Sequence, residues 1–110
     1  MTKVKFFKNN DVLTGFEIKG HAGAGCAGND IVCAAISSAA QMTANTITEI
    51  IGVSAQVEQQ EGLLLVGLSA ENAKKCRHVL EGLKLHLTEL QRQYPHNIMI
   101  IHGGVTNAEY

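Results

Sequence analysis

The sequence predicts a small domain of the α/β class, more closely of the α+β kind: a single-layer, mostly antiparallel sheet with two helices packed on it, in the order ββαββαβ. Three observations lead to this prediction. Two pairs of short segments with alternating or continuous apolar residues are each closed by turn residues, two longer segments have helical spacing, and a last apolar run follows the single proline. A length of 110 residues, 45% of them hydrophobic, suits one domain over residues 1–110 with one core.

The first twenty residues predict a hairpin. Val4 and Phe6 alternate with lysines over residues 3–8, and apolar residues recur at alternate positions over 12–19. Asn9-Asn10-Asp11, between them, supplies turn chemistry.

The next element is a helix from Asp30, a suitable N-cap, to about Ile51. Helical spacing predicts one buried face, made of Val32, Ala35, Ile36, Ala39, Met42, Thr46, Ile47 and Ile50.

A second hairpin is expected from residues 53–60 and 63–68, closed around Glu61-Gly62. The continuous apolar run at 63–66 is typical of a central strand buried on both faces.

The last part of the chain predicts a helix and a strand. Ser69 can cap a helix over 70–94, which ends before Pro95. Residues 97–102 form the last strand, and Gly103-Gly104 opens a short tail. The helix has a core stripe at steps of three and four, made of Ala73, Cys76, Leu80, Leu83, Leu87 and Leu90.

Composition excludes several classes of function. A formal net charge of -1 lacks the basic surface that nucleic-acid binding requires, and no apolar run reaches the length of a membrane span. The first residues, MTKVKFF, do not resemble a signal peptide. Three cysteines cannot all pair, so we expect free thiols in a reducing compartment, the cytoplasm.

Reactive chemistry is concentrated in the glycine-rich stretch GHAGAGCAGNDIVC, residues 20–33. His21 falls at a strand end, and Cys33 falls in the first turn of a helix, where amides lack intrahelical partners and the dipole favours a thiolate. A thiolate with a nearby imidazole and backbone donors is the minimum for acyl transfer. The sequence leaves open whether the two side chains meet.

The other cysteines have simpler interpretations. A buried, unreactive thiol remains the alternative for Cys33. Cys76 lies on the core stripe and is expected to be structural, whereas Cys26 lies in the glycine-rich loop as an accessible bystander or a redox liability.

Three further interpretations are weaker. GAGCAG at 23–28 matches a dinucleotide-binding pattern, but it follows a hairpin strand, and Glu49, the acidic residue at the appropriate distance, falls inside a helix. Zinc ligation by His21, Cys26 and Cys33 fits no common ligand spacing. The second helix mixes basic and acidic residues, which indicates a solvated face; its basic members are Lys74, Lys75, Arg77, His78 and His86.

Gly20-His21-Ala22 followed by Gly28-x-Asp30-Ile31-Val32-Cys33-Ala34-Ala35-x-Ser37 resembles the signature of the ribosomal-processing cysteine protease (Prp) family of bacteria. The resemblance covers essentially the whole chain. It implies a homodimeric cytoplasmic endopeptidase that needs no metal or other cofactor. Its substrate would be the N-terminal extension of large-subunit ribosomal protein twenty-seven, cut after a paired-aromatic sequence, without direct nucleic-acid or membrane partners.

By the same resemblance, His21 and Cys33 match the catalytic pair, while Asp30 and Ser37 match supporting positions. A helix cap would also explain Asp30, and Ser37 could bond back to its own helix. Gly23, Gly25 and Gly28 would form a substrate-binding loop. The loop departs from the family in its small Ala24-Gly25-Cys26-Ala27, which could leave room for an aromatic substrate residue.

Two alternatives remain open at this point. One is a non-catalytic ribosome- or protein-binding module of the same fold that uses the glycine loop as its contact surface. The other is a redox switch, in which Cys26 and Cys33 pair and silence the nucleophile.

Overall fold

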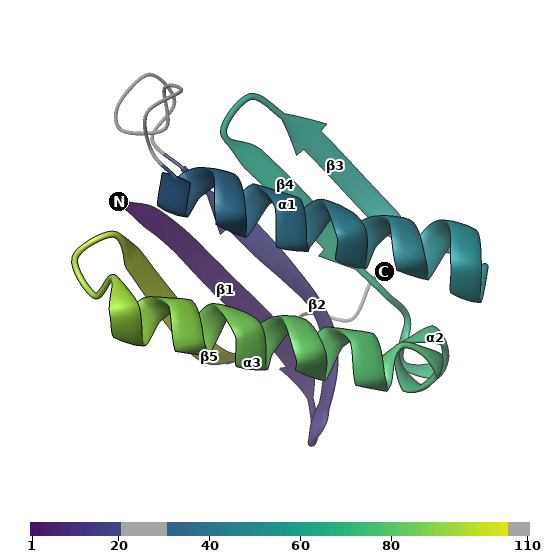
Figure 1. The fold of residues 1–110 in the computed structure, drawn as a ribbon. Coiled ribbons are helices and arrows are strands. Elements are labelled where there is room, and N and C mark those ends of the chain that lie inside the picture. The colour runs from purple at the N-terminus through teal and green to yellow at the C-terminus, as the bar shows by residue number, and fades with distance from the viewer. Residues whose placement is uncertain (21–30, 106–110) are drawn as a thin grey trace.

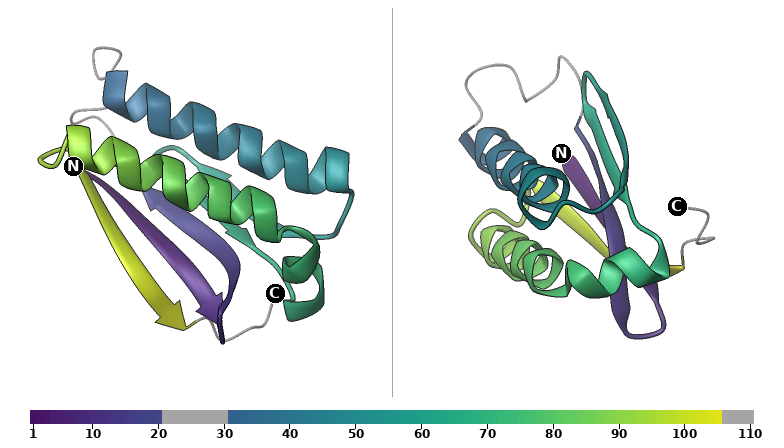
Figure 2. Two further views of the ribbon diagram at one scale, coloured as in Figure 1. Left: turned by 60° about the horizontal axis from the view of Figure 1, so that its bottom comes forward. Right: turned by 90° about the vertical axis from the view of Figure 1, so that its right-hand side faces the viewer.

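The computed structural model describes residues 1–20 and 31–105 and confirms the predicted fold class. Five strands form one sheet in the order β3-β4-β2-β1-β5, in which β1 and β5 are parallel and the other neighbours antiparallel. The helices α1 and α3 lie side by side on one face of this sheet (Figures 1 and 2). In chain order the elements are β1 (Thr2–Asn9), β2 (Val12–Lys19), α1 (Ile31–Asn45), a π-helical segment (Thr46–Ile51), β3 (Gln56–Gln60), β4 (Leu63–Gly67), α2 (Ala70–Lys75), α3 (Arg77–Gln93) and β5 (Ile98–Val105).

The two predicted hairpins are present. Asn9 pairs with Val12 across a two-residue loop, in which Asn10 has a left-handed backbone (φ 57°), a conformation that asparagine tolerates. Gln60 pairs with Leu63 across Glu61-Gly62, where Gly62 has φ 77°. Turn chemistry therefore determined both connections.

The first helix differs from its prediction in which side chains are buried. Met42 is 62% exposed and Ile50 is 79% exposed, so both were wrongly assigned to the core face. Residues 46–51 form a π-helix, whose wider turn places Ile51, not Ile50, over the core after Ile47. Gly52 ends the helix with a left-handed backbone (φ 78°). The buried face contains Val32, Ile36, Ala40, Thr43, Ala44 and Ile47.

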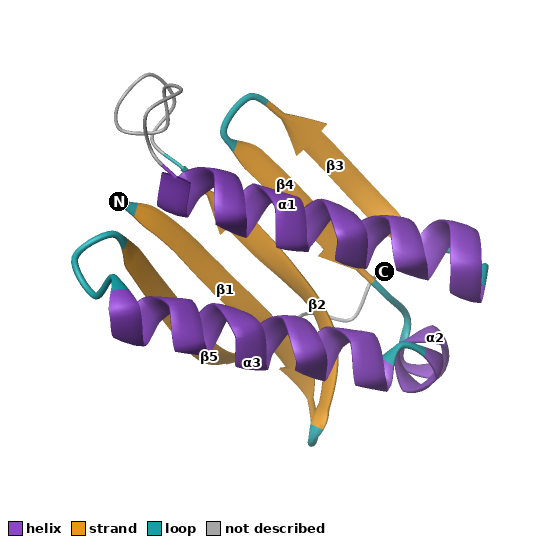
Figure 3. Cartoon of the chain, in the orientation of Figure 1, coloured by secondary structure: helices purple, strands orange, loops and turns teal. Residues whose placement is uncertain are grey.

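The second predicted helix is two helices. Ser69 caps α2 as expected, since its side chain accepts a hydrogen bond from the Asn72 amide at 3.1 Å. At Cys76 the backbone (φ −107°, ψ 12°) leaves the helical region, and α3 begins at the next residue. At this break the chain changes direction: α2 lies at one end of the sheet, and α3 runs along its face (Figure 3). Ala73 and Leu80, on either side of the break, are both buried.

Two strand predictions also require correction. β4 is interior to the sheet, but Leu63 and Leu65 are only half-buried because the helices cover only the opposite face. Gly103-Gly104 continues β5 and does not open a tail, since Gly104 pairs with Phe7 of β1. Main-chain pairing to β1 does not need side chains, so the two glycines do not stop the strand.

The core lies between the inner face of the sheet and the helices. Phe6 and Phe16, register partners on β1 and β2, are fully buried with ring centroids 6.5 Å apart. Leu80, Leu83 and Leu87 reach this layer from α3. The sheet face opposite the helices is not covered by any described element.

Candidate active site

Cys33 lies in the first turn of α1, where the start of this helix meets the start of β1. Its sulfur is half-buried, and the Thr2 hydroxyl donates to it over a Thr2 Oγ1 to Cys33 Sγ distance of 4.0 Å. Thr2 itself is 5% exposed, and its amide donates to the Asn97 carbonyl at 2.9 Å, just before β5. Cys33 on α1 thus contacts the first residue of β1, which is in turn bonded to the segment before β5.

The glycine-rich stretch, residues 20–33, also begins at this end of the sheet. Gly20, the residue before His21, donates its amide to the Gly62 carbonyl in the β3–β4 turn at 3.0 Å. β2 ends where β1 begins, since Lys19 pairs with Lys3. Gly20 and Cys33, the two ends of the glycine-rich segment, are therefore both held at this end of the sheet.

The Cys33 sulfur takes part in a disulfide in this structure. Cys76, the other cysteine within residues 1–20 and 31–105, is a free thiol. A disulfide sulfur is not a thiolate nucleophile, so Cys33 can attack a carbonyl only as the reduced thiol.

Most of the predicted site residues are not in the described part of the chain. His21, Asp30 and the loop glycines Gly23, Gly25 and Gly28 lie outside it, as does Cys26 of the redox hypothesis. Ser37 is described: it lies one turn after Cys33 on α1 and is exposed. Its hydroxyl has no hydrogen-bond partner within the described residues, so the expected bond back to its own helix is not seen there.

Thr2 is the neighbour of Cys33 that sequence reasoning missed. It lies 31 positions away along the chain, and its local pattern indicates only the first residue of a strand. Only the packing of α1 across the start of β1 brings the hydroxyl to the sulfur. The sequence offered one signal of this contact: by strand alternation, Thr2 shares the helix-covered face of β1 with Val4 and Phe6.

Cys76 has the structural role predicted for it. It is fully buried in the core at the junction of α2 and α3. Burial raises the pKa of its thiol, and the Lys75 ammonium opposes that shift in part. The protein therefore keeps this cysteine protonated and out of reach.

The described fold argues against the dinucleotide-binding interpretation, whereas the zinc interpretation depends on His21 and Cys26, which lie outside the described residues. β2 pairs antiparallel with β1 and β4, so the glycine-rich segment does not follow a strand of a parallel βαβ unit, and Glu49 lies within the π-helical segment. Within residues 1–20 and 31–105, no group of three metal-ligating side chains is found. None of the helices in this part of the chain is long and apolar enough to cross a bilayer.

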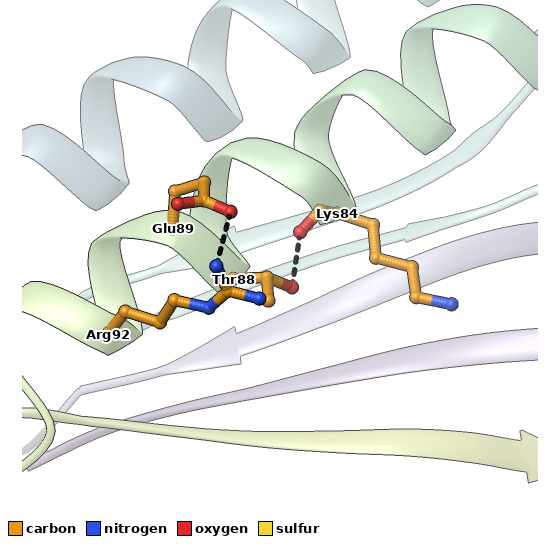
Figure 4. Close-up of polar contacts among 4 residues, drawn as sticks. All are labelled: Lys84, Thr88, Glu89 and Arg92. Carbon is orange, nitrogen blue, oxygen red and sulfur yellow. Dashed lines mark hydrogen bonds and ion pairs between the residues drawn. The ribbon is translucent and has the colours of Figure 1, made fainter.

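The charged residues of α3 form a solvated face, as predicted. Arg92 and Glu89 make an ion pair at 3.3 Å between side chains that are 73% and 51% exposed (Figure 4). The Thr88 hydroxyl is bonded to the Lys84 carbonyl of the same helix. Exposed pairs of this kind contribute at most about 1 kcal/mol, and nothing in this cluster points to a ligand.

A small sheet-and-helix fold with a cysteine in the first turn of a helix is the framework of a thiol-dependent enzyme, and comparison with known proteins identifies the family. The family model described as cysteine protease Prp matches residues 1–99. The chain therefore belongs to the Prp family of cysteine proteases, and its activity is that of a cysteine-type protease.

Solved structures share the fold. A Staphylococcus aureus ribosomal processing protease Prp, in complex with a substrate peptide, matches with a TM-score of 0.81 and 21% identity over 93% of this chain and 99% of that one. SMU.848 from Streptococcus mutans matches with a TM-score of 0.77 and 28% identity over 94% and 95% of the two chains. No match was found among curated proteins.

Proposed function

We propose that the protein is a cytoplasmic cysteine endopeptidase that removes the N-terminal extension of large-subunit ribosomal protein twenty-seven, with Cys33 as nucleophile and His21 as general acid and base. The observation that carries the proposal is the position of Cys33 in the first turn of α1, half-buried at the end of the sheet at which β2 leads into His21. The dipole of a fifteen-residue helix stabilises a thiolate at that position.

The reaction proceeds by acyl transfer. Once reduced, the Cys33 thiolate attacks the scissile carbonyl carbon, and backbone N–H groups around the start of α1 stabilise the resulting oxyanion. The C–N bond breaks as His21 donates its proton to the leaving amine. His21 then takes a proton from water, whose oxygen attacks the thioester and releases the acid and the thiol.

Two structures of one similar protein support the choice of substrate. The Staphylococcus aureus protein is a ribosomal processing protease, known in complex with a substrate peptide and with a covalently linked product peptide. Both structures match this chain with a TM-score of 0.81. We extend the ribosomal substrate, and the homodimer expected from the family, to this protein as parts of the proposal, with Asp30 and Ser37 in supporting roles and Gly23, Gly25 and Gly28 in the loop that contacts the peptide.

The proposal is tested by incubating the reduced protein with a peptide that spans the ribosomal-protein extension and its paired-aromatic site. Mass spectrometry should show cleavage at one internal bond by the wild type. Cys33→Ala should reduce turnover by at least about a thousandfold, because the nucleophile is lost, while peptide binding persists. Cys76→Ala, which removes the buried thiol, is the matched control and should retain activity.

Cleavage by Cys33→Ala at the wild-type rate would disprove the assignment of the nucleophile. Cleavage of the peptide at several unrelated bonds would disprove the assigned substrate.

The disulfide at Cys33 adds a requirement for reduction. Protein in which Cys33 is held in a disulfide should be inactive and should gain activity on treatment with a thiol reductant, because only the free thiolate attacks. Equal activity with and without reductant, with thiol titration verifying the oxidised state, would show that Cys33 is not the attacking group.

A further inference from the structure

A hollow at the end of the sheet near Cys33 is positively charged, and within the described residues no ion pair neutralises it. It has a volume of about 270 Å³ and opens on the face of the sheet opposite the helices, with a lining of Met1, Lys3, Lys19, Gly20, Gly62 and Leu63. No described lining residue is acidic. The two lysines, both exposed, are its only charged side chains among these residues.

The two lysines face each other directly. Lys3 of β1 and Lys19 of β2 are antiparallel register partners, so their side chains project from the same face of the sheet. Like charges in this arrangement destabilise a sheet. In the described residues the ion pair found is Arg92–Glu89 on α3, so no carboxylate pairs with either lysine there.

The nearest described carboxylates do not line the hollow, although Glu17 lies on the same face of β2 as Lys19. Glu17, two residues before Lys19, has Lys5 as its register partner in the next row of the sheet. Glu61 is exposed in the β3–β4 turn, beside Gly62 but not among the lining residues. The arrangement leaves two cationic groups and a space large enough for a side chain, with Leu63 and Met1 as apolar walls.

Chain connectivity links the hollow to the catalytic pair. Lys3 follows Thr2, whose hydroxyl contacts the Cys33 sulfur, and Gly20 of the lining precedes His21. The hollow and Cys33 therefore lie at the same end of the sheet, the hollow on its outer face and Cys33 on the face under the helices.

We infer that this hollow is a specificity subsite that binds an acidic side chain of the peptide substrate, through Lys3 and Lys19. The inference rests on the proposed peptidase function and adds a preference to it. A single carboxylate fits the charge and size of the site better than a nucleic-acid backbone does, because the described lining holds only two lysines and the chain as a whole carries a net charge of -1.

The test uses synthetic peptides with the paired-aromatic cleavage site. Glutamate is placed singly at each of the four positions on either side of the scissile bond, and each peptide is matched by one with glutamine at the same position. For the reduced wild type, one position should show kcat/KM higher for glutamate by about fivefold, mainly through a lower KM, and salt should weaken this preference. The double substitution Lys3→Gln and Lys19→Gln should bring the glutamate-to-glutamine ratio to about one.

Lys5→Gln is the matched control, since Lys5 lies on the same face of β1 but outside the hollow; it should keep the glutamate preference. Cleavage of the peptides with no glutamate preference at any position would overturn the inference and leave the proposed function intact. A glutamate preference that survives in the double variant would also overturn it. The same holds if the double variant loses binding to an RNA oligonucleotide but still binds the acidic peptide.

If no peptide is cleaved, the proposed function fails, and binding decides the inference. Calorimetry with the Cys33→Ala variant should then still show tighter binding of the preferred glutamate peptide, again by about fivefold, and loss of that difference when both lysines are replaced. Equal affinities for the glutamate and glutamine peptides would overturn it.

Discussion

Cys33 and Cys76 have the same side chain but opposite environments. Cys33 is half-buried at a helix start and takes part in a disulfide, whereas Cys76 is fully buried between α2 and α3 as a free thiol. Burial raises the pKa of the Cys76 thiol and disfavours its thiolate, whereas Cys33 lies at a helix start, a position that in general favours a thiolate. At the scale of single residues, reactivity is thus determined by position in the fold.

The raised pKa of Cys76 makes stability depend on pH. Above the ordinary thiol pKa of about 8.5 the unfolded chain loses this proton while the folded chain keeps it, so the unfolded state binds fewer protons. The contribution of Cys76 to the free energy of unfolding should therefore be complete below about pH 8.5, and it should decrease as the pH rises above that value. Urea unfolding of the reduced protein between pH 7.5 and 9.5 measures this decrease.

Cys76→Ala is the control for the pH series. It removes the titrating group, so its stability should fall less steeply with pH than that of the wild type over the same range. Parallel curves for the two proteins would mean that Cys76 does not cause the decrease.

At the scale of elements, the strands β2 and β4 approach each other closely at Gly15. Gly15 pairs with Phe7 of β1 beside a bulge and with Gly67 of β4. A Cβ atom at Gly15 would collide with the backbone carbonyl oxygen of Val66. The glycine is therefore required by strand packing in the interior of the sheet.

Gly15→Ala should lower the free energy of unfolding by more than about 2 kcal/mol, because backbone cannot move aside as a flexible side chain can. Gly82→Ala is the same chemical change in the middle of α3, where nothing lies within 4 Å of the new methyl group. It should raise stability by about 0.5–1 kcal/mol. Urea unfolding of both variants checks the opposite signs; a neutral Gly15→Ala would contradict the close approach.

At the scale of the whole molecule, the sheet is completed by the last strand. β5 pairs in parallel with β1, the first strand, so the two ends of the chain depend on each other. Its side chains alternate between faces: Ile98 is 1% exposed under the helices, and Met99 is 42% exposed on the outer face. The same strand thus contributes to the core and to the open surface.

Ile98→Ala should cost about 2–4 kcal/mol of stability, since it leaves a cavity in the core, whereas Met99→Ala should cost less than about 1 kcal/mol. Thermal or urea unfolding of the two neighbouring variants compares the faces directly. Similar losses for both would indicate that another copy or partner covers the outer face in solution.

Local patterns determined much of this protein. Alternating residues and the Asn-Asp and Glu-Gly turns predicted both hairpins, and Ser69 predicted the start of α2, because strand pairing across a short turn and helix capping are local effects. The glycine-rich signature around His21 and Cys33 predicted the family that the comparison then established. The break between α2 and α3 at Cys76 could not be predicted, because the apolar residues continue at helical spacing through it.

Tertiary structure decided what no local pattern contains. The π-helical turn moved Ile50 out of the core, and the open face of the sheet left Leu63 and Leu65 half-buried. It also placed Thr2 against Cys33 and Lys3 beside Lys19, pairs that are 31 and 16 positions apart in the sequence. Contacts at such separations depend on how helices and strands pack, so sequence periodicity determines which side chains share a face, and only packing determines what they meet.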